Sequence, residues 1–275
     1  MTRIRSVGAL AAGVVPFGQG EAFMESGKIA LVTGGNRGLG RATAQSLARH
    51  GLRVIVTYRG DPHEAEETVK SIQDTGATAA ALRLDISDVA SFPDFTSQLA
   101  AHLERWGASR LDVLVNNAGI GLFGPLETVT PDAYDAVMDT NVRGTFFLIQ
   151  ALAPVLADGG RIINVSSSLS RHTSAGTSVY SASKAAVEVL GRTLAVELGA
   201  RKIRVNAIAP GPTATDFNGG AMRDDAQMRE GLGAQTALGR VGDPQEIGDA
   251  IAALASDDLR WVTAQRLEVS GGALL

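Results

Sequence analysis

The feature that most constrains the fold is a regular alternation of short Val-, Ile- and Leu-rich runs with longer segments of helical length, beginning at Lys28. The runs show little polar alternation, as expected for strands covered by helices on both faces. The expected strands are 28–33, 53–58, 79–84, 111–116, 161–166, 203–208 and 266–271, and the expected helices are about 38–50, 64–75, 88–106, 131–157, 178–199 and 244–256. This order predicts parallel strands joined by right-handed helical crossovers.

The alternation therefore predicts an α/β fold, a doubly wound parallel sheet of about seven strands. We expect residues 27–275 to form it as a single domain, because no repeat or linker interrupts the pattern. The one long irregular stretch, 209–243, has the length of a lid or binding loop, with disorder of its middle as the alternative. Residues 1–26 are expected to be a flexible N-terminal extension that only weakly resembles a secretory signal.

The composition argues against several classes of function. The net charge of −4 and the pI of about 5.6 argue against a nucleic-acid-binding surface, which would carry clustered Lys and Arg. The lack of cysteine excludes disulfides, thiol chemistry and cysteine zinc sites, and the four histidines lack metal-site spacing. No run reaches the ~18 apolar residues of a membrane span. We therefore expect a cytoplasmic protein that binds no metal, nucleic acid or membrane.

The first expected strand runs directly into the glycine-rich turn "TGGNRGLG", residues 33–40, which opens the first expected helix. Gly34, Gly38 and Gly40 lie where a tight turn needs positive φ or the absence of a Cβ. Backbone N–H groups at the start of a helix bind phosphate, and the helix dipole favours negative charge there. At the first strand-to-helix turn of a doubly wound sheet, this pattern predicts a Rossmann-like dinucleotide site.

The end of the second expected strand indicates which dinucleotide binds. NAD usually recruits an Asp or Glu there for the ribose 2′-hydroxyl, whereas an Arg accommodates a 2′-phosphate. The residues at this place are Thr57, Tyr58 and Arg59, with no acid, and Arg37 lies inside the glycine-rich turn. Because guanidinium groups pair strongly with phosphate, we predict NADP(H) in preference to NAD(H). The alternative is that both arginines are ordinary solvated side chains.

A serine, a tyrosine and a lysine are spaced so that their side chains can meet. In "SVYSASKAAV" Tyr180 and Lys184 are four residues apart in an expected helix, and Ser167 lies in a serine run thirteen residues before the tyrosine. A neighbouring ammonium lowers the pKa of a phenol, which is ordinarily about 10, and a hydroxyl stabilises a developing alkoxide. These residues predict acid–base chemistry on a carbonyl, although such a pair also occurs by chance and a serine run can be a simple turn.

Asn141 falls on the apolar stripe of the expected helix 131–157. A mid-helix amide on such a face costs stability unless its hydrogen bonds are made. A buried water linking Asn141 to Lys184 would satisfy the amide and provide a proton path. The alternative is an asparagine that only ties neighbouring backbone together.

Seven motifs resemble those of the short-chain dehydrogenase/reductase family, which includes 3-oxoacyl-carrier-protein reductases, glucose dehydrogenases and carbonyl reductases. The motifs are "TGGNRGLG" (33–40), "LDIS" (84–87), "NNAG" (116–119), "TNVRG" (140–144), "NVSSS" (164–168), "YSASK" (180–184) and "NAIAPGPTATD" (206–216). The resemblance implies a catalytic group of Asn141, Ser167, Tyr180 and Lys184, and its spacing selects Ser167 from the serine run. One departure from the family pattern is Ala264, where a glycine is common.

The resemblance also implies cofactor contacts at matching positions. Asp85 would bond the adenine amino group, Lys184 the nicotinamide ribose, and Thr213 would border the nicotinamide. The full set of expected cofactor-binding residues is Gly34, Asn36, Arg37, Gly38, Leu39, Gly40, Tyr58, Arg59, Asp85, Ile86, Asn116, Ala118, Gly119, Tyr180, Lys184, Pro210, Gly211 and Thr213.

Together these features predict an enzyme, an NADP(H)-dependent oxidoreductase that transfers hydride reversibly between nicotinamide and a carbonyl or secondary alcohol of a small molecule. The alternative is a catalytically silent, nucleotide-sensing binding protein on the same fold. The resemblance implies a homotetramer, or a homodimer, with helices 131–157 and 178–199 at one interface.

The substrate pocket is expected from 120–127, 168–179 and 212–240, which mix apolar and polar residues. Arg171 and His172 in the second of these segments would suit a polar or acidic substrate. The alternative is that both are ordinary exposed loop residues. The sequence does not identify the substrate.

Overall fold

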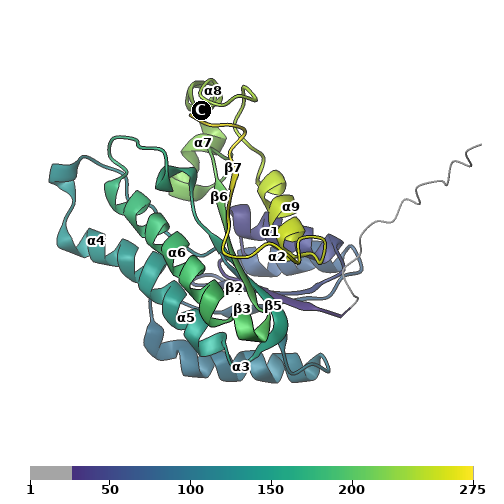
Figure 1. The fold of residues 1–275 in the computed structure, drawn as a ribbon. Coiled ribbons are helices and arrows are strands. Elements are labelled where there is room, and N and C mark those ends of the chain that lie inside the picture. Colours follow the sequence, from purple (N-terminus) through teal and green to yellow (C-terminus); the bar gives the residue numbers. More distant parts are fainter. Residues whose placement is uncertain (1–26, 275) are drawn as a thin grey trace, which may run out of the picture.

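The computed structural model describes residues 27–274, and its centre is a seven-stranded sheet in which all neighbouring strands run parallel (Figure 1). The strands are β1 (Ile29–Val32), β2 (Arg53–Tyr58), β3 (Ala79–Arg83), β4 (Leu111–Asn116), β5 (Leu156–Val165), β6 (Arg204–Pro210) and β7 (Arg266–Val269). Their order across the sheet is β3-β2-β1-β4-β5-β6-β7. The chain thus winds from β1 to one edge, returns beside β1 and winds to the other edge, which confirms the predicted doubly wound fold.

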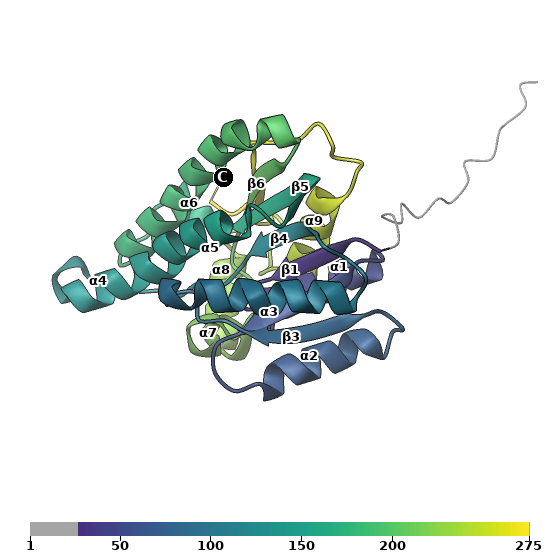
Figure 2. The ribbon, with the colours of Figure 1, turned by 90° about the horizontal axis from the view of Figure 1, so that it is seen from below.

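Helices cover both faces of this sheet (Figures 1 and 2). One face carries α1 (Gly38–Arg49), α2 (His63–Gln73) and α9 (Pro244–Ala255). The other carries α3 (Phe92–Arg105), α5 (Thr145–Leu152) and α6 (Ser178–Glu197), with α4 (Pro131–Met138) preceding α5. Each face has its own hydrophobic core, so the sheet is apolar on both sides.

The central strand β1 shows why the strand sequences lack polar alternation. Ala30 and Val32 pack into the core under α1, α2 and α9, whereas Ile29 and Leu31 pack into the core under α3, α5 and α6. All four side chains are fully buried. Because all strands are parallel, their carboxyl ends meet at one edge of the sheet, where doubly wound folds bind ligands.

The prediction of one helix over 131–157 is wrong. The structure divides it into α4, a π-helical segment Asp139–Gly144, and α5, which ends at Leu152. A π-helical turn accommodates an extra residue, and such turns occur frequently at functional sites. This one contains Asn141, which the sequence placed in a regular helix.

Strand β5 begins five residues earlier than the predicted start at 161. Leu156 pairs with Leu111 of β4, and the register then shifts before the regular pairing of Arg161 with Val113. Gly159, with a φ of 76°, lies in the irregular part. The first part of this strand contains polar residues and glycines, so a prediction based on apolar runs places its start too late.

The segment after β6 forms two short helices, α7 (Ala221–Asp224) and α8 (Ala226–Gly233), where the sequence predicted a lid or binding loop. Its far end is fixed to the end of the chain, since Leu238 N donates to Gly271 O at 3.0 Å. Its near end passes over the carboxyl edge of the sheet, as described below.

Ala264 adopts a φ of 59°, in the left-handed region that favours glycine. Its N–H donates to Val205 O at 2.8 Å and so begins the approach to β7. This backbone conformation gives a physical reason for the glycine expected here.

The predicted flexible extension, residues 1–26, lies outside the described residues, and the domain boundary at residue 27 stays a prediction. Within residues 27–274, none of the helices combines the length and apolar character that crossing a membrane requires.

Candidate active site

The glycine-rich turn between β1 and α1 forms a cradle with no room for side chains. Gly34 and Gly38 have φ values of 61° and 52°. A Cβ at Gly40 would lie 2.1 Å from the Gly34 carbonyl oxygen. Each of the three glycines is therefore required by the backbone itself, as the sequence predicted.

The start of α1 presents backbone N–H groups to an anion, and the Asp216 carboxylate lies beside it, since a Cβ at Gly38 would be 2.8 Å from Asp216 Oδ1. The residue before the helix, Arg37, makes no side-chain cap, and the first turn of α1 contains no acidic residue. The first backbone N–H groups of a helix lack partners within the helix, so they are available to a phosphate. Leu39 packs against the core under α1, and the Asn36 amide donates to Glu64 Oε2 at 2.7 Å.

The "NNAG" segment after β4 is fastened to this turn. Asn117 N and Ala118 N each donate to Thr33 Oγ1 at 3.0 Å, and a Cβ at Gly34 would lie 3.2 Å from Ala118 Cα. Asn117 Nδ2 also donates to Thr33 O at 2.8 Å, a bracing role that the sequence reasoning missed. Asn116 Nδ2 donates to Asn164 Oδ1 at 2.8 Å and so joins β4 to β5, while its cofactor contact stays a prediction.

Three arginines lie along the edge where a 2′-phosphate was predicted. Arg59 is exposed after β2, beside the half-buried Tyr58, and its carbonyl accepts from Arg83 Nε at 3.2 Å. Arg83, at the end of β3, was not predicted, because only the pairing of β3 with β2 brings it beside Arg59. Arg37 Nε lies 3.0 Å from Asp216 Oδ2, so this guanidinium already has an acidic partner.

Asp85 and Ile86 follow β3 at the same edge of the sheet. The Asp85 carboxylate accepts from Ser87 N at 3.0 Å and from Ser87 Oγ at 2.6 Å. Ile86 is buried, and a Cβ at Gly144 would lie 2.1 Å from its carbonyl oxygen. The π-helical segment therefore packs directly against the predicted adenine-binding residues.

Ser167, Tyr180 and Lys184 meet in one buried cluster at the carboxyl end of β5. The Ser167 hydroxyl lies close enough to the Tyr180 phenol to lower the pKa of the phenol. Lys184 Nζ lies 5.8 Å from the centre of the Tyr180 ring and donates to Val165 O at 2.9 Å. Tyr180 and Lys184 are one helical turn apart on α6, which explains their common direction.

Burial shifts the pKa values of both ionisable members of this cluster. It raises the pKa of Tyr180 to about 12, against a smaller lowering by the Ser167 hydrogen bond. It lowers the pKa of Lys184 to about 8. Burial dominates the pKa of Tyr180 in the polypeptide without cofactor, and the Lys184 ammonium is directed at a carbonyl oxygen. The expectation that Lys184 lowers the phenol pKa stays a prediction.

Gly119 lies directly over the lysine. A Cβ at this position would lie 3.2 Å from Lys184 Nζ and 3.0 Å from Asn141 Oδ1. Only a glycine brings the backbone after "NNA" this close to the catalytic cluster, which links the β4 loop to α6.

The Asn141 amide ties neighbouring backbone together, which the sequence left as an alternative. Its Nδ2 donates to Ile120 O and its Oδ1 accepts from Ile120 N, both at 2.9 Å. Nδ2 also donates to Ser183 Oγ at 3.0 Å. The side chain thus clamps the chain after Gly119 against α6.

Among the residues after β6, Thr215 and Asp216 face the glycine-rich turn more directly than Thr213. Thr213 donates its hydroxyl to Gly211 O at 3.0 Å, whereas a Cβ at Gly38 would lie 3.7 Å from Thr215 Cβ and 2.8 Å from Asp216 Oδ1. Pro210 ends β6, and Gly211 passes so close to β7 that a Cβ there would lie 2.6 Å from Ser270 Cα.

Two phenylalanines that the sequence reasoning did not single out border the Tyr180 ring. The Phe123 and Phe217 ring centres lie 5.4 Å and 5.9 Å from that of Tyr180. They belong to two of the segments from which a substrate pocket was predicted. In contrast, His172 turns toward β7, where its Nε2 lies 3.1 Å from Glu268 Oε1, and Arg171 is exposed.

Comparison with known proteins identifies the family to which the chain belongs. A family model described as enoyl-(acyl carrier protein) reductase matches residues 34–273, including the glycine-rich turn and the catalytic cluster. The chain belongs to the short-chain dehydrogenase/reductase family.

Members of this family resemble the chain along most of its length. An uncharacterized oxidoreductase of Methylorubrum extorquens is 40% identical over 246 residues, covering 90% of this chain and 97% of the relative. The trihydroxynaphthalene reductase PfmaI of Pestalotiopsis fici is 37% identical, covering 94% of each chain.

Solved structures of short-chain dehydrogenases/reductases share the fold. The angucycline C-6 ketoreductase LanV with bound NADP superposes with a TM-score of 0.85 at 40% identity, covering 90% of this chain and 95% of LanV. A Burkholderia cenocepacia short-chain dehydrogenase in complex with NADP gives a TM-score of 0.83 at 37% identity, covering 91% and 99%. These similarities support an oxidoreductase that uses a nicotinamide cofactor.

Proposed function

We propose that this short-chain dehydrogenase/reductase catalyses reversible hydride transfer between NADP(H) and a carbonyl or secondary alcohol carbon. The observation that carries the proposal is the convergence of Ser167, Tyr180 and Lys184 in one buried cluster, with Gly119 joining it to the loop that braces the glycine-rich turn. A merely structural tyrosine would not require a hydroxyl and an ammonium beside it.

The cofactor, when bound, supplies or accepts the hydride, and the side chains handle the proton. The Ser167 hydroxyl donates a hydrogen bond to the substrate oxygen and stabilises its developing negative charge. Tyr180 donates its phenolic proton to the same oxygen during reduction and recovers it during oxidation. A pKa of about 12 keeps the phenol protonated at neutral pH, as a proton donor requires.

Lys184 is suited to restore the proton that Tyr180 gives up. Its pKa of about 8 lies near working pH, where proton exchange is efficient. The side-chain atoms of Asn141 are engaged with Ile120 and Ser183, so a relay through Asn141 would use its backbone carbonyl. That carbonyl accepts from Thr145 Oγ1 at 2.9 Å.

The preference for NADP(H) rests on the three arginines at the 2′-phosphate edge. Arg59 and Arg83 lie together at the ends of β2 and β3, and Arg37 lies in the glycine-rich turn. Asp216 holds Arg37 and so competes with a phosphate for it. We therefore assign the larger share of phosphate binding to Arg59 and Arg83.

The assembly proposed is a homotetramer or homodimer through α4, α5 and α6. Large apolar side chains on these helices are exposed, namely Tyr134, Phe146, Val189 and Val196. Their burial against a second copy would favour association. The cytoplasmic location stays a prediction.

The experiment that tests the proposal is NADPH consumption by the purified protein with a panel of ketones, aldehydes and quinones. We expect turnover with at least one carbonyl class, and a higher kcat/KM for NADPH than for NADH. Equal kcat/KM for the two cofactors would reject the role of the arginines. NADPH binding without consumption across the panel would favour the silent, nucleotide-sensing alternative.

A further inference from the structure

Three aromatic rings meet at the mouth of the active site. Tyr180 is inclined at 42° to Phe123 and at 46° to Phe217. The two phenylalanine rings stand edge to face, with centres 6.5 Å apart. Phe123 comes from the loop after β4 and Phe217 from the segment after β6, so two separate elements cover the phenol.

Phe123 has an unusual exposure for its size. Its side chain is 42% exposed, although burying a phenylalanine ring is strongly favourable. The local sequence makes room for the arrangement, because a Cβ at Gly121 would lie 2.5 Å from Phe123 Cε2 and 3.0 Å from Phe217 Cζ. The glycine thus allows both rings to approach, and Phe123 presents part of its surface outward beside the catalytic phenol.

Phe217 is attached to the cofactor side of the site. It follows Asp216, which pairs with Arg37, and its N–H donates to Thr215 Oγ1 at 3.3 Å. Its ring therefore occupies a defined position over Tyr180. Both phenylalanine rings therefore lie beside the ring whose hydroxyl is proposed to meet the substrate oxygen.

We propose that Phe123 and Phe217 form an aromatic clamp that selects cyclic ketones fused to a benzene ring. This inference rests on the proposed function and specifies its substrate class. Aromatic rings favour offset-stacked and edge-to-face contacts beyond the gain from buried area, and the clamp offers rings in both orientations. A saturated ring system of the same outline fills similar space but lacks the electron distribution that these contacts need.

The test compares two neutral bicyclic ketones of similar outline, 2-tetralone and trans-2-decalone, whose carbonyls are both unconjugated. With NADPH and the full chain, we expect kcat/KM for 2-tetralone to exceed that for 2-decalone by about tenfold or more, since two ring contacts act on only one of the ketones. Phe123→Leu and Phe217→Leu keep apolar volume, and each should reduce this ratio severalfold.

Trp261→Leu is the control, because this ring is 98% exposed, belongs to no proposed site and should leave the ratio unchanged. A wild-type ratio near one with both ketones reduced would overturn the clamp and leave the proposed function standing. A high ratio that survives both clamp substitutions would also overturn it. Failure to oxidise NADPH with any ketone would instead reject the proposed function.

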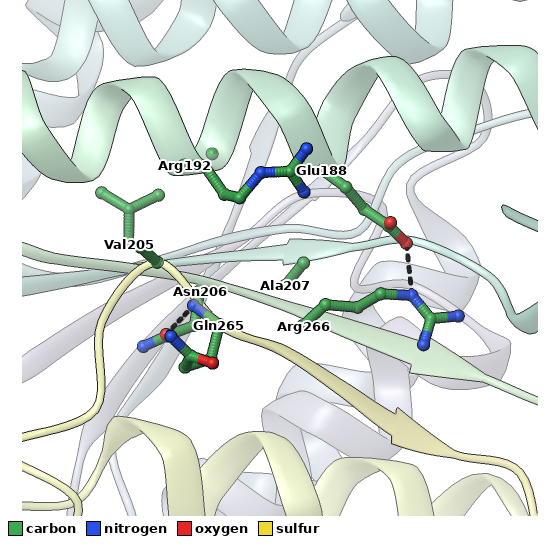
Figure 3. A pocket seen from close by; sticks show the side chains of 9 residues that line it. Glu188, Arg192, Val205, Asn206, Ala207, Gln265 and Arg266 are labelled. Carbon is green, nitrogen blue, oxygen red and sulfur yellow. Dashed lines mark hydrogen bonds and ion pairs between the residues drawn. The ribbon is translucent and has the colours of Figure 1, made fainter. Parts of the chain in front are cut away.

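A different set of contacts concerns Glu188, which lies one turn after Lys184 and two turns after Tyr180 on α6. Its carboxylate is 8% exposed, and Oε1 accepts from Ser166 Oγ at 2.5 Å and from Ser170 Oγ at 2.6 Å. It also pairs with Arg266 Nε of β7 at 2.8 Å, beside a small cavity (Figure 3). Glu188 Oε1 thus links α6 to β7 and to the two serines.

These contacts enclose the segment that presents Ser167. Ser166 and Ser170 lie on either side of it, and Ser170 Oγ also lies 2.7 Å from Ser167 O, so its one hydroxyl hydrogen is shared between this carbonyl and Glu188. Arg266 Nη2 reaches the same carbonyl at 3.3 Å. We infer that Glu188 and Arg266 are positioning residues, which hold the Ser167 hydroxyl in register with the Tyr180 phenol.

Glu188→Ala should lower kcat by about tenfold to a hundredfold while the Kd for NADPH stays within about twofold, because misplacement of a catalytic group by about 1 Å has effects of this size. Glu188→Gln keeps an acceptor for both serines and should recover much of the lost kcat. A Glu188→Ala protein with lowered Tm but wild-type kcat would overturn the inference, as would a Gln variant no better than Ala.

Discussion

Tyr180→Phe is expected to lower kcat for carbonyl reduction by about 10²- to 10⁴-fold, the usual contribution of general acid–base catalysis. The substitution removes only the phenolic hydroxyl, which lies beside Ser167, and the ring contacts with Phe123 and Phe217 remain available. Steady-state NADPH oxidation with 2-tetralone measures the loss, and titration of NADPH fluorescence measures cofactor affinity.

The Kd for NADPH should change little in this variant, because the phenol is proposed to act on the substrate oxygen. Tyr134→Phe is the matched control, since Tyr134 is exposed on α4 and should retain wild-type kcat. Retention of more than about a tenth of wild-type kcat by Tyr180→Phe would contradict the proton-donor role.

Lys184→Met should lower kcat/KM by about a hundredfold or more and also weaken NADPH binding. The change removes the ammonium beside the phenol and the proposed ribose contact, but preserves most of the side-chain length. Lys70→Met, at an exposed lysine paired with Asp74, is the control and should leave both quantities unchanged. Unchanged NADPH affinity in Lys184→Met would remove the ribose contact from the account.

The pH dependence of folding separates this catalytic loss from misfolding. Burial lowers the Lys184 pKa to about 8, so between about pH 8 and its unfolded pKa the unfolded state binds more protons than the folded state. In that window the contribution of Lys184 to the free energy of unfolding of the wild type rises with pH. Below pH 8 the buried lysine is charged, and its burial lowers the free energy of unfolding by the full amount. Lys184→Met lacks this contribution and should unfold with a higher free energy at pH 7.

The fold was predictable because the apolar composition of the strands indicates that helices cover both faces of the sheet. In β1, for example, all four residues are apolar and fully buried, and the glycine-rich turn follows immediately. The π-helical segment Asp139–Gly144 was not predictable, because its composition also suits a regular helix and tertiary packing against Ile86 accompanies it. The early start of β5 was hidden by the polar sequence before Arg161.

The site was predictable where spacing along one element decides the geometry. Tyr180 and Lys184 share a face of α6 for this reason. Contacts between distant elements were not predictable, such as Arg37 with Asp216 or Glu188 with Arg266, since no local pattern pairs them. The raised pKa of Tyr180 was not predictable either, because it depends on how deeply the fold buries the phenol.

The central claim is that Tyr180 becomes an acid–base catalyst when the positive charge of NADP⁺ lies beside the phenol. The chain has three tyrosines, so ultraviolet titration of the wild type minus that of Tyr180→Phe isolates this phenol. Without cofactor, burial should keep Tyr180 protonated to a pKa of about 12. With saturating NADP⁺, we expect its ionisation to fall below about pH 10, because a nearby cation stabilises phenolate. The same pKa with and without NADP⁺ would contradict the account.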